Sequence, residues 1–191
     1  GVLLIFDEVM CGMGRTGALF AGDVDGVTPD IVAIAKGLGA GYQPIGAMLC
    51  QDYIHDAIEH GSGFFQHGHT YLGHPIAAAA ANAVLDRLVV DGLVDDVAQK
   101  GEYLKSQLKA KLGQHPHIGN IRGRGLFVGI EFVASQDDKT PFDPALNMAG
   151  NLKKNAFQSG LVCYPAQGTI DGRTGDHALL APPPRTTNDE R

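Results

Sequence analysis

Two residues of opposite charge follow apolar segments of strand length and could do chemistry together. Asp7 comes directly after "VLLIF" (2–6), and Lys36 follows "IVAIA" (31–35) and precedes the glycine-rich "GLGAG". In open α/β sheets, ligands bind beyond the carboxyl ends of parallel strands, so an acid and an amine from two strands can converge on one crevice. The amine could serve as nucleophile and base, and the carboxylate as a fixed negative charge. The structural alternative is an ion pair that closes the sheet, because a buried charge needs a partner.

The first part of the chain is typical of an α/β sheet. The apolar runs 2–6 and 31–35 do not alternate with polar residues, which predicts parallel strands buried on both faces. A further strand is predicted at 45–50, and "QDYIHDAIEHG" predicts a short helix that ends at Gly61. These elements place Asp7 and Lys36 at strand ends.

The second part of the chain changes to longer helices followed by short strands. Pro75 suits the first position of a helix, and apolar residues at helical spacing predict a second helix at about 93–112. Four further elements are predicted: a strand or hairpin at 121–133, a helix at 145–159, and short strands in "LVCYP" and "HALLAPP". We expect a boundary around residues 86–100, and hence one domain over 1–90 and a second, α+β domain over 91–191.

The composition favours a globular protein and argues against some classes of partner. The 191 residues are 44% hydrophobic and 19% charged, which is enough apolar residue to form a core. The net charge of −6 argues against general binding to nucleic acids or anionic membranes, which relies on clustered cations. Three widely spaced cysteines without a CxxC pair indicate reduced thiols and hence a cytoplasmic protein.

The start of the chain and its longest small-apolar run bear on targeting. "GVLLIFDEV" has no initiating Met and no basic region, so no signal peptide is predicted. "PIAAAAANAVL" (75–85) is too short and too weakly hydrophobic to span a bilayer. Because the chain opens directly on a predicted strand, we expect it to be a fragment of a longer protein.

Three segments together carry a family resemblance. "LLIFDEVMCGMGRTG", "PDIVAIAKGLGAGYQPIGAM" and "HGHTYLGHPIAAAAANAVL" resemble, in order and spacing, the class III (omega) aminotransferases that use pyridoxal 5′-phosphate. The resemblance continues more weakly through "IRGRGLFVGIEF" and "GDHALLAPP". It implies part of the large domain of a fold-type I pyridoxal-phosphate-dependent transferase, with a mostly parallel sheet, followed by a small α+β domain.

The resemblance also implies roles for four residues. Lys36 matches the lysine that forms the internal aldimine with the cofactor, and Asp7 matches the carboxylate that keeps the pyridine nitrogen protonated. Val9 matches the apolar residue packed on one face of the ring. Thr70 matches the threonine that reaches the cofactor phosphate across a dimer interface. Around Lys36, small residues and the cofactor would leave the amine partly desolvated, which lowers an amine's pKa.

The family's activity then becomes the expectation for the longer protein. The resemblance implies a homodimer that moves an amino group from an amine or amino acid to a keto acid or aldehyde. The family's chains are about twice as long, so the N-terminal half and the last helix of the small domain are missing here. We therefore expect the fragment alone to be inactive. The alternative is a non-catalytic remnant or interaction module, but the presence of Asp7, Lys36 and Thr70 together favours the enzyme.

Two other groups of residues leave alternatives open. His67, His69 and His74 in "HGHTYLGH" could suggest a histidine-based metal site, although no carboxylate or Cys ligand pattern accompanies them. Arg173 lies where some family members carry an arginine that binds the substrate carboxylate. Three other arginines compete with it for that role: Arg122, Arg124 and Arg185. The sequence does not identify the donor or the acceptor.

Overall fold

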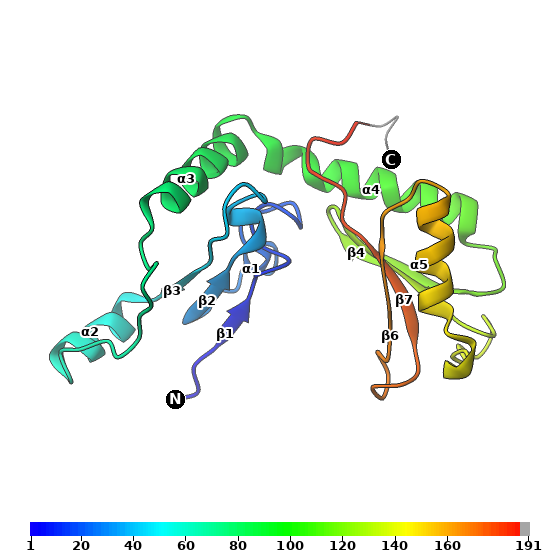
Figure 1. Ribbon diagram of the computed structural model, residues 1–191, viewed down its shortest axis with the longest axis horizontal. Coiled ribbons are helices and arrows are strands. Elements are labelled where there is room, and N and C mark those ends of the chain that lie inside the picture. Colours follow the sequence, from blue (N-terminus) through cyan, green and yellow to red (C-terminus); the bar gives the residue numbers. More distant parts are fainter. Residues whose placement is uncertain (188–191) are drawn as a thin grey trace. The chain divides into compact units, whose positions relative to one another are not determined.

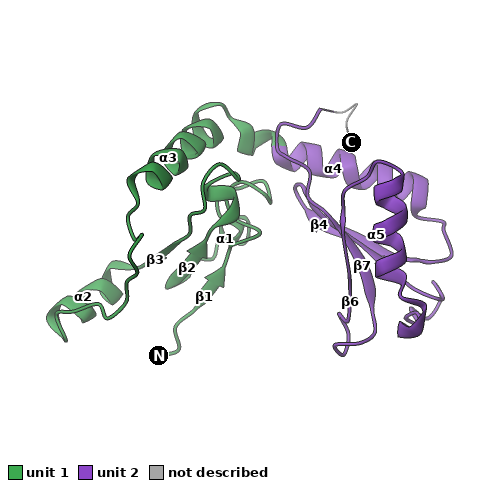
Figure 2. Cartoon of the chain, in the orientation of Figure 1, with its two compact units in different colours: residues 1–96 green, residues 97–191 purple. Residues whose placement is uncertain are grey.

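The computed structural model describes residues 1–187 and divides the chain into two compact units. They comprise Gly1–Asp96 and Val97–Arg191, coloured separately in Figure 2. The division falls inside the interval 86–100 in which the sequence predicts a boundary. The last helix that the resemblance implies lies outside the described residues.

The first unit contains a three-stranded mixed sheet. Its strands are β1 (Ile5–Asp7), β2 (Ile31–Ile34) and β3 (Ala47–Cys50), in the order β1-β2-β3. β1 and β2 are parallel, whereas β3 runs antiparallel to β2. Only one of the two strand pairs in this part of the fold is therefore parallel. The helical elements of the unit are α1 (Ala21–Asp25), the 3₁₀ turn η1 (Lys36–Leu38), α2 (Asp52–His60) and α3 (Pro75–Val90).

The first strand is shorter and more exposed than the sequence predicts. Regular strand pairing begins at Ile5. The side chain of Val2 is 98% exposed and that of Ile5 is 61% exposed. The carbonyl of Leu4 accepts the N–H groups of Asp30 and Ile31, so the ladder begins only where Asp30 turns the chain into β2. The prediction that this strand is buried on both faces is wrong for this chain, because Ile5 and Asp7 are exposed and Phe6 is only half-buried.

Helix α3 covers one side of the first unit's core. Pro75 stands at its first position, and His74 caps it by accepting the Ala77 N–H on Nδ1 at 3.4 Å. Ala81 and Leu88 are buried in one cluster with Met13, Ile34 and Leu38. The cluster joins the helix to the end of β2 and to η1, the segment that carries Lys36.

The second unit is an antiparallel sheet covered by helices. Helix α4 (Leu93–Leu112) leads into the hairpin of β4 (Ile118–Arg124) and β5 (Phe127–Phe132). The turn η2 (Pro144–Leu146), α5 (Met148–Gln158), β6 (Tyr164–Gln167) and β7 (Asp176–Leu180) complete the unit, whose strand order is β4-β5-β7-β6. Figure 1 labels α4, α5, β4, β6 and β7 of this unit.

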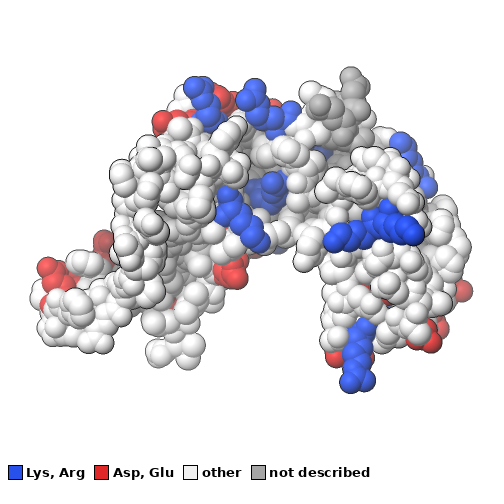
Figure 3. Space-filling view, viewed as in Figure 1, with Lys and Arg blue, Asp and Glu red and all other residues white. Residues whose placement is uncertain are grey.

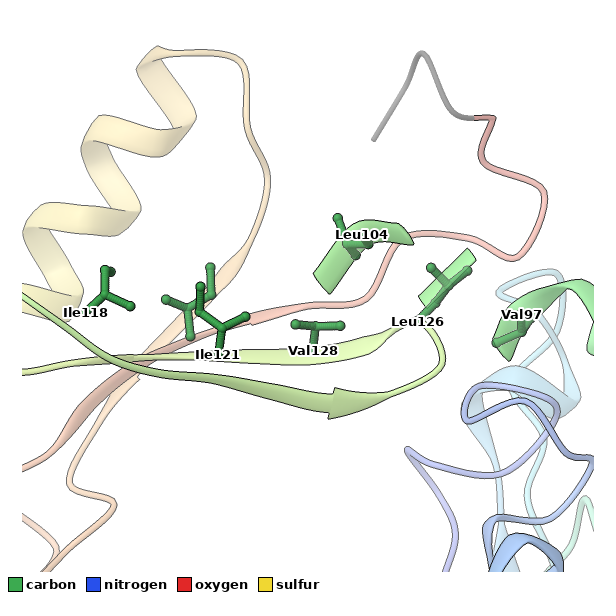
Figure 4. Packing of buried hydrophobic residues seen from close by; sticks show 7 residues of the cluster. Val97, Leu104, Ile118, Ile121, Leu126 and Val128 are labelled. Atoms are coloured by element: carbon green, nitrogen blue, oxygen red, sulfur yellow. The ribbon is translucent and has the colours of Figure 1, made fainter. Parts of the chain in front are cut away.

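The core of the second unit lies between α4 and the hairpin. Val97 and Leu104 of α4 pack with residues of β4, β5 and the turn between them. Figure 4 shows these side chains between the helix and the sheet: Val97, Leu104, Ile118, Ile121, Leu126 and Val128. Leu126 and Val128 of the hairpin and Val97 of α4 are fully buried, so the hairpin and the helix share one core.

Candidate active site

The parallel pairing of β1 and β2 brings Asp7 and Lys36 to the same edge of the first sheet. Asp7 is the last residue of β1 and stands opposite Ala33, and Lys36 follows β2 by two residues. Both side chains are exposed, and neither forms an ion pair among residues 1–187. The alternative of a buried ion pair closing the sheet is therefore wrong for this chain.

The carboxylate of Asp7 is fixed on one side and open on the other. Its Oδ1 accepts the Val9 N–H at 3.1 Å, which holds the side chain over the turn that follows β1. The Asp7 carbonyl accepts the Cys11 thiol at 3.6 Å. The second carboxylate oxygen has no partner within the described part of the chain, and Val9 beside it is half-buried. Asp7 can thus accept a further hydrogen bond from a cationic N–H group.

Lys36 has an unusual backbone conformation that buried neighbours maintain. Its φ is 42°, in the left-handed region that costs a non-glycine residue about 1–3 kcal/mol. Ile34 and Leu38 on either side are buried at 7% and 5% exposure and pack against α3. The turn closes through hydrogen bonds from Leu38 N to the Ala35 carbonyl at 2.9 Å and from Gly39 N to the Lys36 carbonyl at 3.2 Å. Strain of this kind clusters at functional sites.

The Lys36 side chain contacts Met10. Nζ lies against the Met10 sulfur, so the amine reaches over the turn that carries Asp7. Gly37 is required at its position, because a Cβ there would come within 2.8 Å of the Met13 Cβ. The Lys36 side chain is exposed in the structure, and the expected desolvation of the amine beside a bound cofactor stays a prediction.

Glu8, which the sequence analysis did not single out, is the buried acid at this edge. It is 3% exposed, and its two carboxylate oxygens accept the N–H groups of Ala21 at 2.7 Å and Gly22 at 2.9 Å. Two acids side by side in the sequence thus have opposite environments. The adjacent acids "DE" were the sequence signal that could have pointed to Glu8. Which of the two acids is buried depends on where α1 begins.

Thr70 lies apart from the Asp7–Lys36 edge within one chain. It is exposed in a turn, next to a hollow of about 610 Å³ lined by its neighbours His69 and Tyr71. The rest of the lining comes from three segments: 43–46, 72–74 and 77–78. Neither Asp7 nor Lys36 lines this hollow. The structure therefore brings three of the four predicted site residues, Asp7, Val9 and Lys36, to one sheet edge, and Thr70 lies beside a hollow that Asp7 and Lys36 do not line.

The three histidines of "HGHTYLGH" do not gather as a set of metal ligands within residues 1–187. The described side chains that do come close enough are His55, Asp56 and Glu59, all exposed on α2. His74 instead caps α3. Exposed groups of this kind are common without an ion, so the α2 cluster is no evidence of a metal site.

The candidate substrate arginines all lie in the second unit. Arg122 on β4 pairs with Glu131 of β5 at 3.1 Å, which is a structural partner on the sheet. Arg173 is exposed in the loop between β6 and β7, where its backbone N–H donates to Asp171 at 2.9 Å. Arg124 and Arg185 are exposed as well. Which of them binds substrate stays a prediction.

Comparison with known proteins decides the family. Residues 1–172 match the family described as aminotransferase class-III. This chain belongs to that family. An aminotransferase of Gibberella zeae is 48% identical over 183 residues, which cover 95% of this chain and 36% of the relative.

Solved structures agree with this result. A transaminase from a marine Virgibacillus bacterium superposes with a TM-score of 0.92 at 31% identity, over 100% of this chain and 42% of that one. An amine transaminase from an uncultivated Pseudomonas species, in its PLP-bound form, gives a TM-score of 0.89 at 38% identity, again over 100% of this chain and 42% of that one. The chain is thus a class III aminotransferase fragment with the fold of these transaminases, and it spans about two fifths of their length.

Proposed function

We propose that this chain is the part of a pyridoxal-phosphate-dependent transaminase that carries the cofactor's lysine. One observation supports the proposal most strongly: the parallel register of β1 and β2 places Asp7 and Lys36 at one sheet edge, with Nζ reaching over the Asp7 turn. The family membership agrees with this reading of the two residues.

The residues present fit this cofactor. The site offers a primary amine for the cofactor's aldehyde and an open carboxylate oxygen for its pyridine nitrogen. It also offers a half-buried valine for one face of the aromatic ring. Small residues flank Lys36, so the backbone leaves room for a planar group. When bound, pyridoxal phosphate supplies an electron sink for the carbon from which a proton is removed.

Each residue then has a defined task. With the cofactor bound, the Lys36 amine would bond to the cofactor aldehyde and, when free, would move the proton at the substrate's α-carbon. Asp7 would keep the ring nitrogen protonated through its negative charge, and Val9 would pack on the ring. The exposed hydroxyl of Thr70 would donate to the cofactor phosphate of a second subunit, so the active form that we propose is a homodimer.

The substrates follow from the family and belong to the whole protein. We propose an amine or amino acid as donor and a keto acid or aldehyde as acceptor, in a cytoplasmic enzyme.

The proposal is tested by replacing the lysine in the protein translated from the complete reading frame. We expect Lys36→Ala to abolish amino transfer from a panel of amines and amino acids to pyruvate and 2-oxoglutarate. Lys154→Ala, which removes an exposed lysine of α5, is the matched control and should keep the unaltered protein's rate. A Lys36→Ala protein whose turnover stays within tenfold of the unaltered protein would exclude Lys36 from this role.

A further inference from the structure

Glu8 is a buried carboxylate whose polar atoms are all engaged. Burying a carboxylate is costly unless hydrogen bonds compensate it, and here each oxygen accepts one backbone N–H at the start of α1. Its own N–H donates to the Ala33 carbonyl at 2.9 Å, and its carbonyl accepts the Gly12 N–H at 2.9 Å. Glu8 therefore has no free group for a substrate or a cofactor.

These four hydrogen bonds connect the segments that form the site. Ala33 belongs to β2 and stands opposite Asp7 in the sheet register, while Gly12 belongs to the loop after β1. The Glu8 carboxylate also connects these segments to α1, which begins 13 residues further along the chain. Because Glu8 lies between Asp7 and Val9, fixing its peptide groups fixes the turn that aims the Asp7 carboxylate.

Gly12 packs closely against Glu8. A Cβ at Gly12 would come within 2.8 Å of the Glu8 carbonyl oxygen and within 3.1 Å of its Oε2. The loop after β1 therefore contacts Glu8 directly. A displaced Glu8 carboxylate would clash with the backbone of this loop, which supports the Asp7 turn.

We propose that Glu8 is a positioning residue for Asp7: it anchors the turn after β1 to β2 and α1 so that the Asp7 carboxylate is held where the cofactor's ring nitrogen binds. This inference rests on the proposed function, because it assumes that Asp7 faces the ring nitrogen. Through its bond to Ala33, Glu8 also fixes the strand that leads to Lys36.

Two variants weaken the anchor in different ways. Glu8→Gln keeps the shape but replaces one accepting oxygen by an amide that opposes a backbone N–H. Ala21→Pro keeps the Glu8 charge and removes the N–H that donates to Oε2. Proline is favoured at the first helical position, and Phe20 before it already has φ −113° and ψ 139°, the extended conformation that proline requires. Ala21→Pro should therefore fold even if Glu8→Gln does not.

Asp176→Asn is the matched control. Asp176 is also a buried carboxylate, at 2% exposure, and it accepts the Ala149 N–H at the start of α5 in the second unit. Asp176→Asn therefore weakens a similar buried hydrogen bond to a helix start but leaves the Asp7 turn unchanged.

The experiment follows the ring nitrogen itself. The full-length holoprotein is prepared with pyridoxal phosphate labelled with ¹⁵N in the ring, and the nitrogen chemical shift is titrated with pH. We expect Glu8→Gln and Ala21→Pro to lower the ratio of protonated to unprotonated nitrogen at a given pH by about tenfold, the size of the loss that removing an outer hydrogen-bond partner causes in metal sites. Asp176→Asn should titrate as the unaltered protein does.

Asp7→Asn separates the two claims. If it shifts the titration while the folded anchor variants do not, the inference about Glu8 is wrong and the proposed function stands. If Asp7→Asn leaves the titration unchanged, the role proposed for Asp7 fails, and the inference fails with it. If Glu8→Gln does not fold, Ala21→Pro alone decides.

Discussion

At the scale of single residues, the sheet edge shows how backbone position determines chemistry. Asp7 and Glu8 are neighbours with the same functional group, yet Asp7 is open to a ligand and Glu8 is buried under α1.

The charges of Asp7 and Glu8 also affect the nearby thiol of Cys11. Burial raises the pKa of the Cys11 thiol above its usual value of 9.0, and the nearby charges of Glu8 and Asp7 raise it further.

The thiol reactivities of the chain follow from these pKa shifts. A raised thiol pKa means less thiolate at neutral pH, and thiolate is the form that reacts with iodoacetamide. Cys11 and Cys163 both have pKa values raised by burial, whereas Cys50 is exposed on β3. We expect Cys50 to be alkylated first at pH 7, with the rates at Cys11 and Cys163 rising as the pH increases through 9. Peptide mass mapping over time measures the order, and faster labelling of Cys11 than of Cys50 at pH 7 would contradict it.

At the scale of elements, Asp30 connects the beginning of β1 to α2. Its carboxylate accepts the Leu4 N–H at 2.6 Å and the Tyr53 hydroxyl. The Leu4 hydrogen bond and then that of Tyr53 lower the pKa of Asp30 below its usual value of 3.8. A group whose pKa is depressed in the folded state stabilises the fold above its unfolded pKa, and this contribution is lost as the pH falls through the folded value.

The consequence is a pH-dependent effect of Asp30→Asn. We expect the variant to have a lower Tm than the unaltered chain at pH 6–7, because the charged acceptor is lost. The difference should begin to shrink as the pH falls below about 4, where Asp30 of the unfolded chain takes up a proton, and should be lost as the pH falls through the lower pKa of folded Asp30. Tyr53→Phe removes one of the two donors and should give a smaller difference with the same trend. A difference in Tm between the unaltered chain and Asp30→Asn that stays constant from pH 3 to pH 7 would refute this account.

The elements also show what sequence could predict. The helix at 93–112 has the bounds expected from its apolar spacing, and α3 starts at Pro75 as predicted. Asp7 and Lys36 could be identified because strand ends are visible as apolar runs. Glu8 could not, since its burial depends on contact with α1, an element of five residues with no strong pattern. The position of Met10 against Lys36 depends in the same way on a loop that only the tertiary structure defines.

At the scale of the whole molecule, the first unit exposes apolar strands. β1 and β3 are the outer strands of the described three-stranded sheet, and Met48 and Leu49 on β3 are 51% and 43% exposed. Uncharged residues occupy most of the face drawn in Figure 3. No helix within residues 1–187 is both long and apolar enough to cross a membrane. Exposed strand edges of this kind promote association between chains.

We therefore expect the 191-residue chain to self-associate at micromolar concentration. Leu49→Lys should raise the monomer fraction in sedimentation velocity, because a charge on an outer strand opposes pairing between edges. Val162→Lys, at a position that is 82% exposed in the second unit, serves as control and should change the fraction little. Equal effects of the two substitutions would show that association does not involve the β3 edge.

The central claim is that Lys36 holds the cofactor, and reductive labelling tests it most directly. The full-length protein is incubated with pyridoxal phosphate, reduced with borohydride, digested and mapped by mass spectrometry. We expect the cofactor's mass on the peptide that contains Lys36, and we expect Lys36→Ala to remove it. Stable labelling of a different lysine in the unaltered protein, with Lys36 unmodified, would contradict the account.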